Sequence, residues 1–182
     1  MKHEFFSRDP RKVAKDLLGC KIIKEGVEAE IVETEAYLGE KDPASHARNG
    51  KTDRNAPMYE EPGKAYVYVS YGIHNMFNIV AHEENKVGAV LIRAVKPVKG
   101  LDVMKERRGL EDEGSLGDGP GKLTEALDID KTDNRTGLLE GSFRIEEGTL
   151  GEEFEESTRI GISEGLQHDY RYSVRNSVYV SR

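Results

Sequence analysis

The chain has 182 residues and one cysteine, Cys20, so it is long enough for a single buried core and has no internal disulfide. The sequence has neither the apolar run of a signal peptide nor an apolar stretch of about 18 residues, as a membrane helix requires, so we expect one reduced, cytoplasmic domain over residues 1–182. The formal net charge of −7 opposes binding to an anionic partner, but segment 93–108 has six basic residues against two acidic ones and could form either a basic face or an ordinary solvated helix face.

The first half of the chain predicts a helix followed by strands. Asp9 directly before Pro10, with apolar residues at helical spacing after it, predicts an N-capped amphipathic helix that ends at Gly19. Four segments rich in β-branched or aromatic residues follow, separated by Gly, Pro and Asn: 20–23, 27–37, 65–70 and 87–94. Together they predict one curled, largely antiparallel sheet.

The second half predicts short helices and further strands. Leu101–Arg108 and Lys122–Leu127 have helical patterns, and the tail from Phe143 onward mixes strand-like pieces with acidic loops. Gly, Glu and Asp dominate segment 109–119, so we expect an exposed, mobile loop there. The elements predict an α+β fold, a single mixed domain around a curved, barrel-like, largely antiparallel sheet with short flanking helices.

Glu35 is the candidate catalytic carboxylate. If no bulge interrupts the strand, alternation places Ala29, Ile31, Glu33 and Glu35 on one face, and Glu35 points inward. A carboxylate in a partly apolar pocket has a raised pKa and can accept a proton from water. Most glutamates lie on the surface, and what distinguishes this one is the set of residues that follows it.

The residues after Glu35 include side chains that can stack on a base, contact its edge or bind a phosphate. They are Tyr37, His46, Tyr68, Tyr71, Asn78 and Arg93. Tyrosines and histidines on strands are ordinarily packing residues. Tyr71 precedes Gly72 at a predicted hairpin tip, so it is either an exposed turn residue or a wedge that enters a base stack.

Six segments of the chain are distinctive: "EFFSRDPRKVAKDLLG", "VETEAYLGEKDPASHARNGKTDRNAPM", "GKAYVYVSYGIHNMFN", "LIRAVKP", "GPGKLTEAL" and "RIGI". Together they resemble the alkyladenine DNA glycosylase family, also called the 3-methyladenine DNA glycosylases. The resemblance extends over nearly the whole chain. It implies a mixed domain around a curved antiparallel sheet and a partner that is double-stranded DNA containing damaged purines.

The resemblance also implies a mechanism in which the damaged nucleotide is flipped out of the duplex and water is the nucleophile. Glu35 is then the general base that activates the water, and Arg93 and the backbone of Ile160 help to hold it. We expect no metal ion and no cofactor. A monomer is favoured by analogy with the family.

The resemblance assigns the remaining site residues to the flipped nucleotide and to the gap that it leaves. Tyr37, His46 and Tyr68 are expected to sandwich the extruded base, and Asn78 is expected to crowd the exocyclic amine of guanine. Tyr71 matches the residue that intercalates into the duplex.

Lys122 is interpreted as a phosphate contact. Its setting, Gly119-Pro120-Gly121-Lys122-Leu123, lacks the glycine spacing of a nucleotide-binding loop and has no Ser or Thr directly after the lysine. No lysine lies within "VETEAY", which is consistent with hydrolysis rather than a Schiff base.

Two other classes of function stay open at this point. One is a non-catalytic, damage-sensing DNA-binding module, although the Glu35 and Arg93 pair argues against it. The other is a glycosidase that acts on sugars, which needs a second acid; Glu33 is a poor candidate, because its motif neighbours are aromatic residues that stack on bases rather than polar groups that bind sugars. Metal catalysis is a weaker alternative, since the histidines lack ligand-like spacing.

Overall fold

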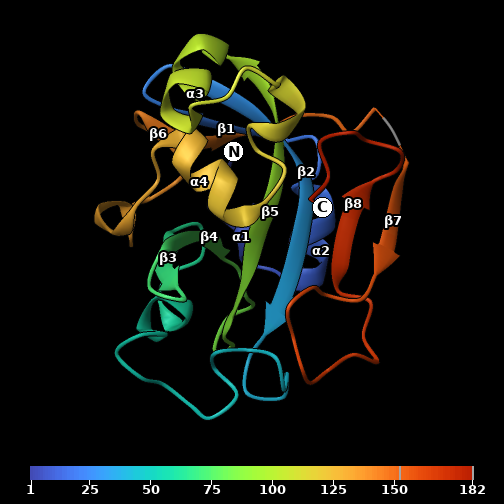
Figure 1. Cartoon of the computed structure of the whole chain (residues 1–182). Coiled ribbons are helices and arrows are strands. Elements are labelled where there is room, and N and C mark those ends of the chain that lie inside the picture. Colours follow the sequence, from blue (N-terminus) through green and yellow to red (C-terminus); the bar gives the residue numbers. More distant parts are fainter. Residues whose placement is uncertain (152, 182) are drawn as a thin grey trace.

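The computed structural model describes residues 1–151 and 153–181 and shows a strongly curled sheet with short helices packed against it (Figure 1). The helices are α1 (His3–Phe6), α2 (Pro10–Asp16), α3 (Leu101–Arg108) and α4 (Pro120–Leu127). The strands are β1 (Lys21–Lys24), β2 (Val27–Leu38), β3 (Ala65–Ser70), β4 (His74–Val80), β5 (Gly88–Lys99), β6 (Phe143–Glu146), β7 (Phe154–Ser157) and β8 (Arg171–Val174). Short 3₁₀ helices span Ala56–Tyr59, Glu113–Ser115 and Lys131–Asp133.

The sheet has the order β3-β4-β5-β2-β1-β6 and divides at β2, where β8 also pairs and brings β7 with it. All pairings between these strands are antiparallel. The main apolar core lies between the sheet and the helices, because residues of α2 and α4 belong to one buried cluster with β2 and β5. The predicted fold class, a single mixed α+β domain around a curved antiparallel sheet, is confirmed.

Several predicted elements form as expected. The Asp9 side chain accepts a hydrogen bond from the Arg11 backbone at 2.8 Å, so it caps α2 as its position before Pro10 predicts. Helix α3 has the predicted bounds. Strand β4 completes the hairpin expected at Tyr71, but its bounds were not predicted, because His74, Asn75 and Asn78 interrupt its apolar pattern with polar residues that are common in turns.

The predicted alternation along β2 is wrong because a β-bulge interrupts it. Ile31 pairs with Val95 and Glu33 with Ala94, so the strand register shifts between these two pairs. Beyond the bulge, Thr34 faces α2, where its hydroxyl donates to the Ala14 carbonyl at 2.9 Å. Glu33 therefore lies on the face opposite Ile31 rather than beside it.

The predicted exposure of segment 109–119 is also wrong over its second half. Leu116 is completely buried, and residues 117–119 are buried with it. The Gly117 carbonyl accepts a hydrogen bond from the Val95 backbone at 3.0 Å. A side chain at Gly117 would meet Val95 at 2.6 Å, so this glycine allows the segment to pack directly on β5.

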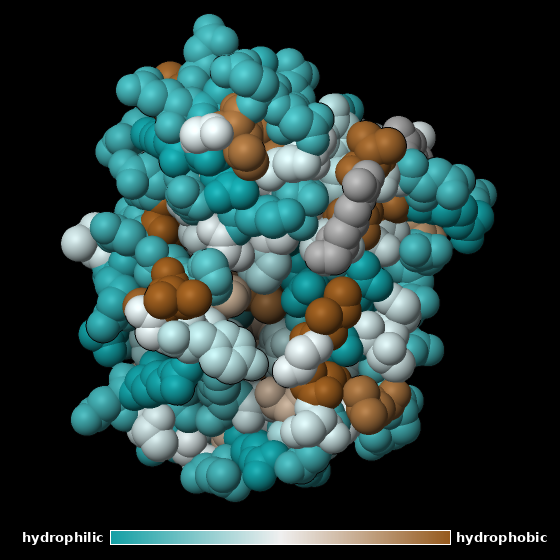
Figure 2. Space-filling model, in the orientation of Figure 1, coloured by the Kyte–Doolittle hydropathy of each residue, from teal (hydrophilic) through white to brown (hydrophobic). Residues whose placement is uncertain are grey.

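The basic residues of segment 93–108 do not form a free basic face. Arg93 is buried, and on α3 Lys105 pairs with Glu111 and Glu113. The two α3 arginines pair with Asp128 and Glu125. Figure 2 shows one face of the molecule, mostly hydrophilic with small, separate apolar patches. In the described part of the chain, no helix is long and apolar enough to cross a membrane.

Candidate active site

A cavity of about 190 Å³ brings together four of the predicted site residues. Tyr37 comes from β2, Tyr68 from β3 and Asn78 from β4, and His46 comes from the loop after β2. The further lining residues are Ala44, Arg54, Met58, Tyr66, Ser70, Ala89, Gly161 and Ile162. The curl of the sheet thus places aromatic side chains from neighbouring strands around one small space.

His46 is fixed within an aromatic cluster. Its ring lies edge-on to Tyr68 at a centroid distance of 4.7 Å, and its Nδ1 lies 3.0 Å from the hydroxyl of Tyr66. Burial lowers the pKa of His46, and the positive charge of Arg54 lowers it further. The imidazole is therefore neutral at neutral pH and offers a stacking surface without a positive charge.

Asn78 is buried against its own hairpin. Its amide nitrogen donates to the Tyr66 carbonyl at 3.1 Å and to the Met76 carbonyl at 3.3 Å. These two bonds give the side-chain amide one orientation at the cavity wall. A rigid group at this position can exclude a base by shape.

Glu35 lies behind Tyr37 and is completely buried. The Tyr37 hydroxyl donates to Glu35 Oε2 at 2.7 Å, and the Ile160 backbone N–H donates to Oε1 at 2.8 Å. Arg93 Nη1 lies 3.3 Å from Oε1. Burial raises the pKa of Glu35 even though Arg93 and these two donors favour the charged form.

The predicted catalytic set of Glu35, Arg93 and Ile160 is thus assembled from β2, β5 and a loop more than sixty residues further along the chain. Arg93 is buried, which by itself would lower its pKa, but Glu35 and Glu33 raise it, so the guanidinium stays charged. The site therefore holds a buried carboxylate, a fixed cation and a backbone N–H around one point.

Tyr71 occupies the tip of the hairpin between β3 and β4 and is 93% exposed. Tyr71 and Gly72 both have positive φ, 50° and 76°, as a type I′ turn requires. A left-handed backbone is unfavourable for a tyrosine. The neighbouring Ile73 is 74% exposed, so the turn presents two large side chains to solvent.

Arg159 is a site residue that the sequence analysis missed. It is buried and forms two bonds with Asp42, at 2.6 and 2.8 Å. Its guanidinium lies 4.7 Å from the ring centroid of Tyr37 and supports that ring from behind. Since Arg159 precedes Ile160, the same ion pair fixes the backbone N–H that reaches Glu35.

Asp42 and Arg54 were also missed. Asp42 accepts hydrogen bonds from the backbone of Leu38 and Ala44, so it orders the loop that carries His46. The exposed Arg54 lies 5.3 Å from the ring centroid of Tyr68. Both residues are within the "VETEAYLGEKDPASHARNGKTDRNAPM" segment, but nothing in their spacing indicates contacts so far apart in sequence.

Lys122 does not line the cavity. Its amine lies 2.9 Å from the buried carboxylate of Asp118, one turn away at the start of α4. The preceding Gly121 packs against His74, which a side chain at that position would meet at 3.1 Å. His74 pairs with Ser70 directly beside the turn, so Lys122 follows a glycine packed near the tip of the β3–β4 hairpin, and its contact with phosphate stays a prediction.

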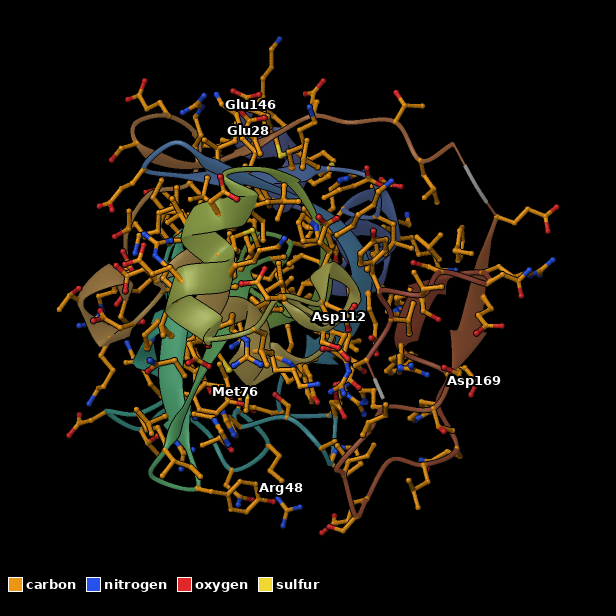
Figure 3. All side chains as sticks on the ribbon, turned by 45° about the horizontal axis from the view of Figure 1, so that its top comes forward. Glu28, Arg48, Met76, Asp112, Glu146 and Asp169 are labelled. Atoms are coloured by element: carbon orange, nitrogen blue, oxygen red, sulfur yellow. The ribbon has the colours of Figure 1, made fainter. Side chains whose placement is uncertain are left out.

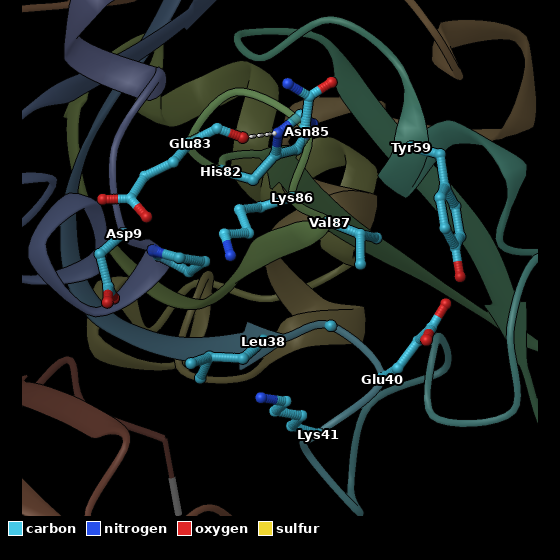
Figure 4. A pocket seen from close by; sticks show the side chains of 12 residues that line it. Asp9, Leu38, Glu40, Lys41, Tyr59, His82, Glu83, Asn85, Lys86 and Val87 are labelled. Atoms are coloured by element: carbon cyan, nitrogen blue, oxygen red, sulfur yellow. Dashed lines mark hydrogen bonds between the residues drawn. The ribbon is translucent and has the colours of Figure 1, made fainter.

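A larger cavity of about 450 Å³ lies outside this cluster (Figure 4). Glu40, Lys41, Glu83 and Lys86 line it, and both ring nitrogens of His82 are occupied by backbone carbonyls. It contains none of the predicted site residues. Over residues 1–151 and 153–181, no group of three or more His, Cys, Asp or Glu side chains is arranged to hold a metal ion.

Comparison with known proteins identifies the class as a DNA glycosylase. The model of the methylpurine-DNA glycosylase family matches residues 4–178, and the chain belongs to this family. It is 44% identical over 182 residues to a protein of Rhodopseudomonas palustris strain BisB18, covering 100% of this chain and 90% of that one. A Carboxydothermus hydrogenoformans protein is 45% identical over 188 residues, covering 98% of this chain and 97% of that one.

A third relative, from Methanoculleus marisnigri, is 44% identical over 186 residues, covering 98% of this chain and 96% of its own. All three relatives carry the name "Putative 3-methyladenine DNA glycosylase". The chain is therefore a DNA-3-methyladenine glycosylase, a hydrolase of the N-glycosyl bond whose substrate is DNA. The predicted family and enzyme class are confirmed.

Proposed function

We propose that this enzyme flips alkylated and deaminated purines out of duplex DNA into the aromatic cavity and hydrolyses the glycosidic bond with a water molecule activated by Glu35. The observation that carries the proposal is the completely buried Glu35 carboxylate directly behind the cavity wall, held by Arg93, Ile160 and Tyr37. Enzymes that act on a stacked base have to extrude it first, at a cost of a few kcal/mol.

The cavity can recover this cost through stacking. Tyr37, His46 and Tyr68 provide aromatic surfaces, and a base on an aromatic ring gains about 1–3 kcal/mol. Damaged bases pair poorly and are cheaper to extrude. Asn78, fixed at the cavity wall, would crowd the exocyclic amine of guanine, and Tyr71 would fill the gap left in the duplex.

In the chemical step, Glu35 accepts a proton from water while the water oxygen bonds to C1′ of the sugar. The bond between C1′ and the purine nitrogen breaks, and its electron pair leaves with the base. A cationic methylated purine leaves as a neutral molecule, so it needs no acid, whereas hypoxanthine requires a proton on a ring nitrogen. The products are a free base and an abasic site.

Glu35→Gln tests this mechanism, because the amide keeps the shape of the side chain but cannot take the proton. We expect release of 3-methyladenine and hypoxanthine by the wild type and a loss of roughly 10²- to 10⁴-fold in the variant, with duplex binding retained. Binding without release by either protein would favour the damage-sensing module. We further propose a monomer that works in the compartment holding the DNA, which size-exclusion chromatography and localisation would test.

A further inference from the structure

Glu33 is a second completely buried carboxylate, two residues before Glu35 on β2. Its Oε1 accepts from Arg93 Nε at 2.9 Å, from Arg171 Nε at 2.6 Å and from the Ser181 hydroxyl at 2.8 Å. Its Oε2 accepts from the Ser181 backbone N–H at 2.7 Å. Four donors from β5, β8 and the end of the described chain therefore converge on one side chain.

We propose that Glu33, held by Arg171 and Ser181, is a positioning residue that turns Arg93 so that a single nitrogen faces Glu35. This inference rests on the proposed roles of Glu35 and Arg93. With both oxygens occupied and no exposed surface, Glu33 cannot reach a substrate. The alternative of a sugar glycosidase with Glu33 as its second acid is therefore disfavoured.

The geometry of the guanidinium explains how Glu33 acts. The Nε and Nη2 atoms share one edge of the planar group; Nε donates to Glu33, and Nη2 donates to the Ser181 hydroxyl at 3.3 Å. The remaining nitrogen, Nη1, faces Glu35 and lies 3.3 Å from its Oε1. Arginine and carboxylate otherwise prefer a two-bond pair along this edge.

Without Glu33, that edge of Arg93 becomes available to Glu35. A two-bond pair would hold the Glu35 carboxylate as a spectator anion and make it a weaker base. Glu33 prevents this by satisfying the favoured edge of Arg93 itself. The same contact leaves Arg93 charged and in place beside the reacting water.

Electrostatics supports the same role. The titratable and charged groups around Glu35 come from every element packed against it. They are Glu33 and Tyr37 on β2, Tyr68 on β3, Arg93 on β5 and Arg159 in the loop between β7 and β8. Glu33 counters part of the Arg93 charge, and its own negative charge raises the pKa of Glu35 further. Removing the negative charge of Glu33 and freeing the edge of Arg93 would therefore both lower the pKa of Glu35.

Stability alone does not account for this cluster. Burying a carboxylate with two arginines has a large desolvation cost, and apolar residues of similar volume often replace such clusters with no loss of stability. The cluster shares Arg93 with Glu35, which connects it directly to the candidate catalytic group.

The test compares Glu33→Gln and Ser181→Ala with the wild type in single-turnover release of 3-methyladenine from duplex DNA. Release of this cationic lesion needs no acid, so the acidic limb of its pH–rate profile reports the ionisation of the base, Glu35. Glu28→Gln is the matched control, since Glu28 lies on the same strand but pairs with the exposed Lys99. In Figure 3, Glu28 lies at the end of the molecule opposite Arg48.

We expect Glu33→Gln to slow release roughly 10- to 100-fold, as misplacement of a catalytic group does, and to move the acidic limb to lower pH. Binding to a duplex with an uncleavable abasic analogue should stay within about twofold, because Glu33 does not reach DNA. Ser181→Ala should slow release less and leave the pH profile in place, since it changes no charge. Glu28→Gln should match the wild type in both measurements.

A Glu33→Gln variant with an unshifted acidic limb would overturn the inference, whatever its rate. If that variant does not fold, as circular dichroism would show, a wild-type rate in Ser181→Ala would overturn it instead. Glu35→Gln separates the two proposals. Full release by that variant would refute the proposed mechanism, whereas its loss of activity beside an unaffected Glu33→Gln would refute only the positioning role.

Discussion

Replacing Tyr71 with asparagine should stabilise the fold and impair the enzyme. Tyr71 has a φ of 50°, a conformation that costs most residues about 1–2 kcal/mol but that asparagine tolerates, and Asn-Gly is a favoured pair in type I′ turns. Because Tyr71 is 93% exposed, the substitution loses almost no buried surface. We expect a gain of about 0.5–1 kcal/mol, equivalent to roughly 1–4 °C in Tm for a domain of this size.

Activity should change in the opposite direction on duplex DNA. If the tyrosine ring replaces the stacking of the flipped base, its loss removes about 1–3 kcal/mol and lowers kcat/KM roughly 5- to 150-fold. A single strand has no gap to fill, so release from single-stranded DNA should change little.

The matched control is Ile73→Asn, which alters the same exposed turn at a residue without positive φ and should not raise Tm. Thermal unfolding and single-turnover release on both substrates measure the two effects. A Tyr71→Asn variant that excises from duplex DNA at the wild-type rate would refute the wedge, and one with a lowered Tm would refute the assignment of backbone strain.

Three further predictions concern charge at the site. Asp42→Ala leaves Arg159 buried without its partner and should lower the free energy of unfolding in urea by about 3–5 kcal/mol. The control is Glu156, which pairs with a lysine at the surface, and Glu156→Ala should lower the free energy of unfolding by no more than about 1 kcal/mol. Burial raises the pKa of Glu35 above its ordinary value of 4.5, so the stability it contributes is present below that value and is lost as pH rises through the folded-state pKa. Glu35→Gln should therefore be more stable than the wild type at pH 7, and a difference that does not shrink toward pH 4.5 would contradict this. Arg54 has no carboxylate within ion-pair distance among the described residues, so Arg54→Gln should raise release of cationic relative to neutral bases about two- to fivefold; an equal loss for both would indicate a phosphate contact instead.

Local signals in the sequence were sufficient for much of the fold. Asp9 before Pro10 specifies the start of α2 because capping is decided by adjacent residues. The bulge after Ile31 could not be predicted, since no glycine marks it and it depends on pairing with β5. The bounds of strand β4 could not be predicted because polar residues interrupt its apolar pattern, and one of these residues, Asn78, lines the cavity.

The candidate site divides in the same way. The resemblance supplied Glu35 and its neighbours, and the structure brings them together. The Arg159–Asp42 pair and the four donors around Glu33 join segments at least sixty residues apart, and no periodicity in the sequence indicates such contacts. The sequence left open whether the basic residues of α3 form a basic face or a solvated helix face, and in the structure they pair with acidic residues outside the helix.

The most direct test of the central claim is release of free 3-methyladenine from lesion-bearing duplex DNA, with EDTA present, by the wild type and by Glu35→Gln. Our account predicts release by the wild type and a rate at least about 100-fold lower in the variant, because the amide cannot accept a proton from water. Equal release by the two proteins would contradict the assignment of Glu35 as the base.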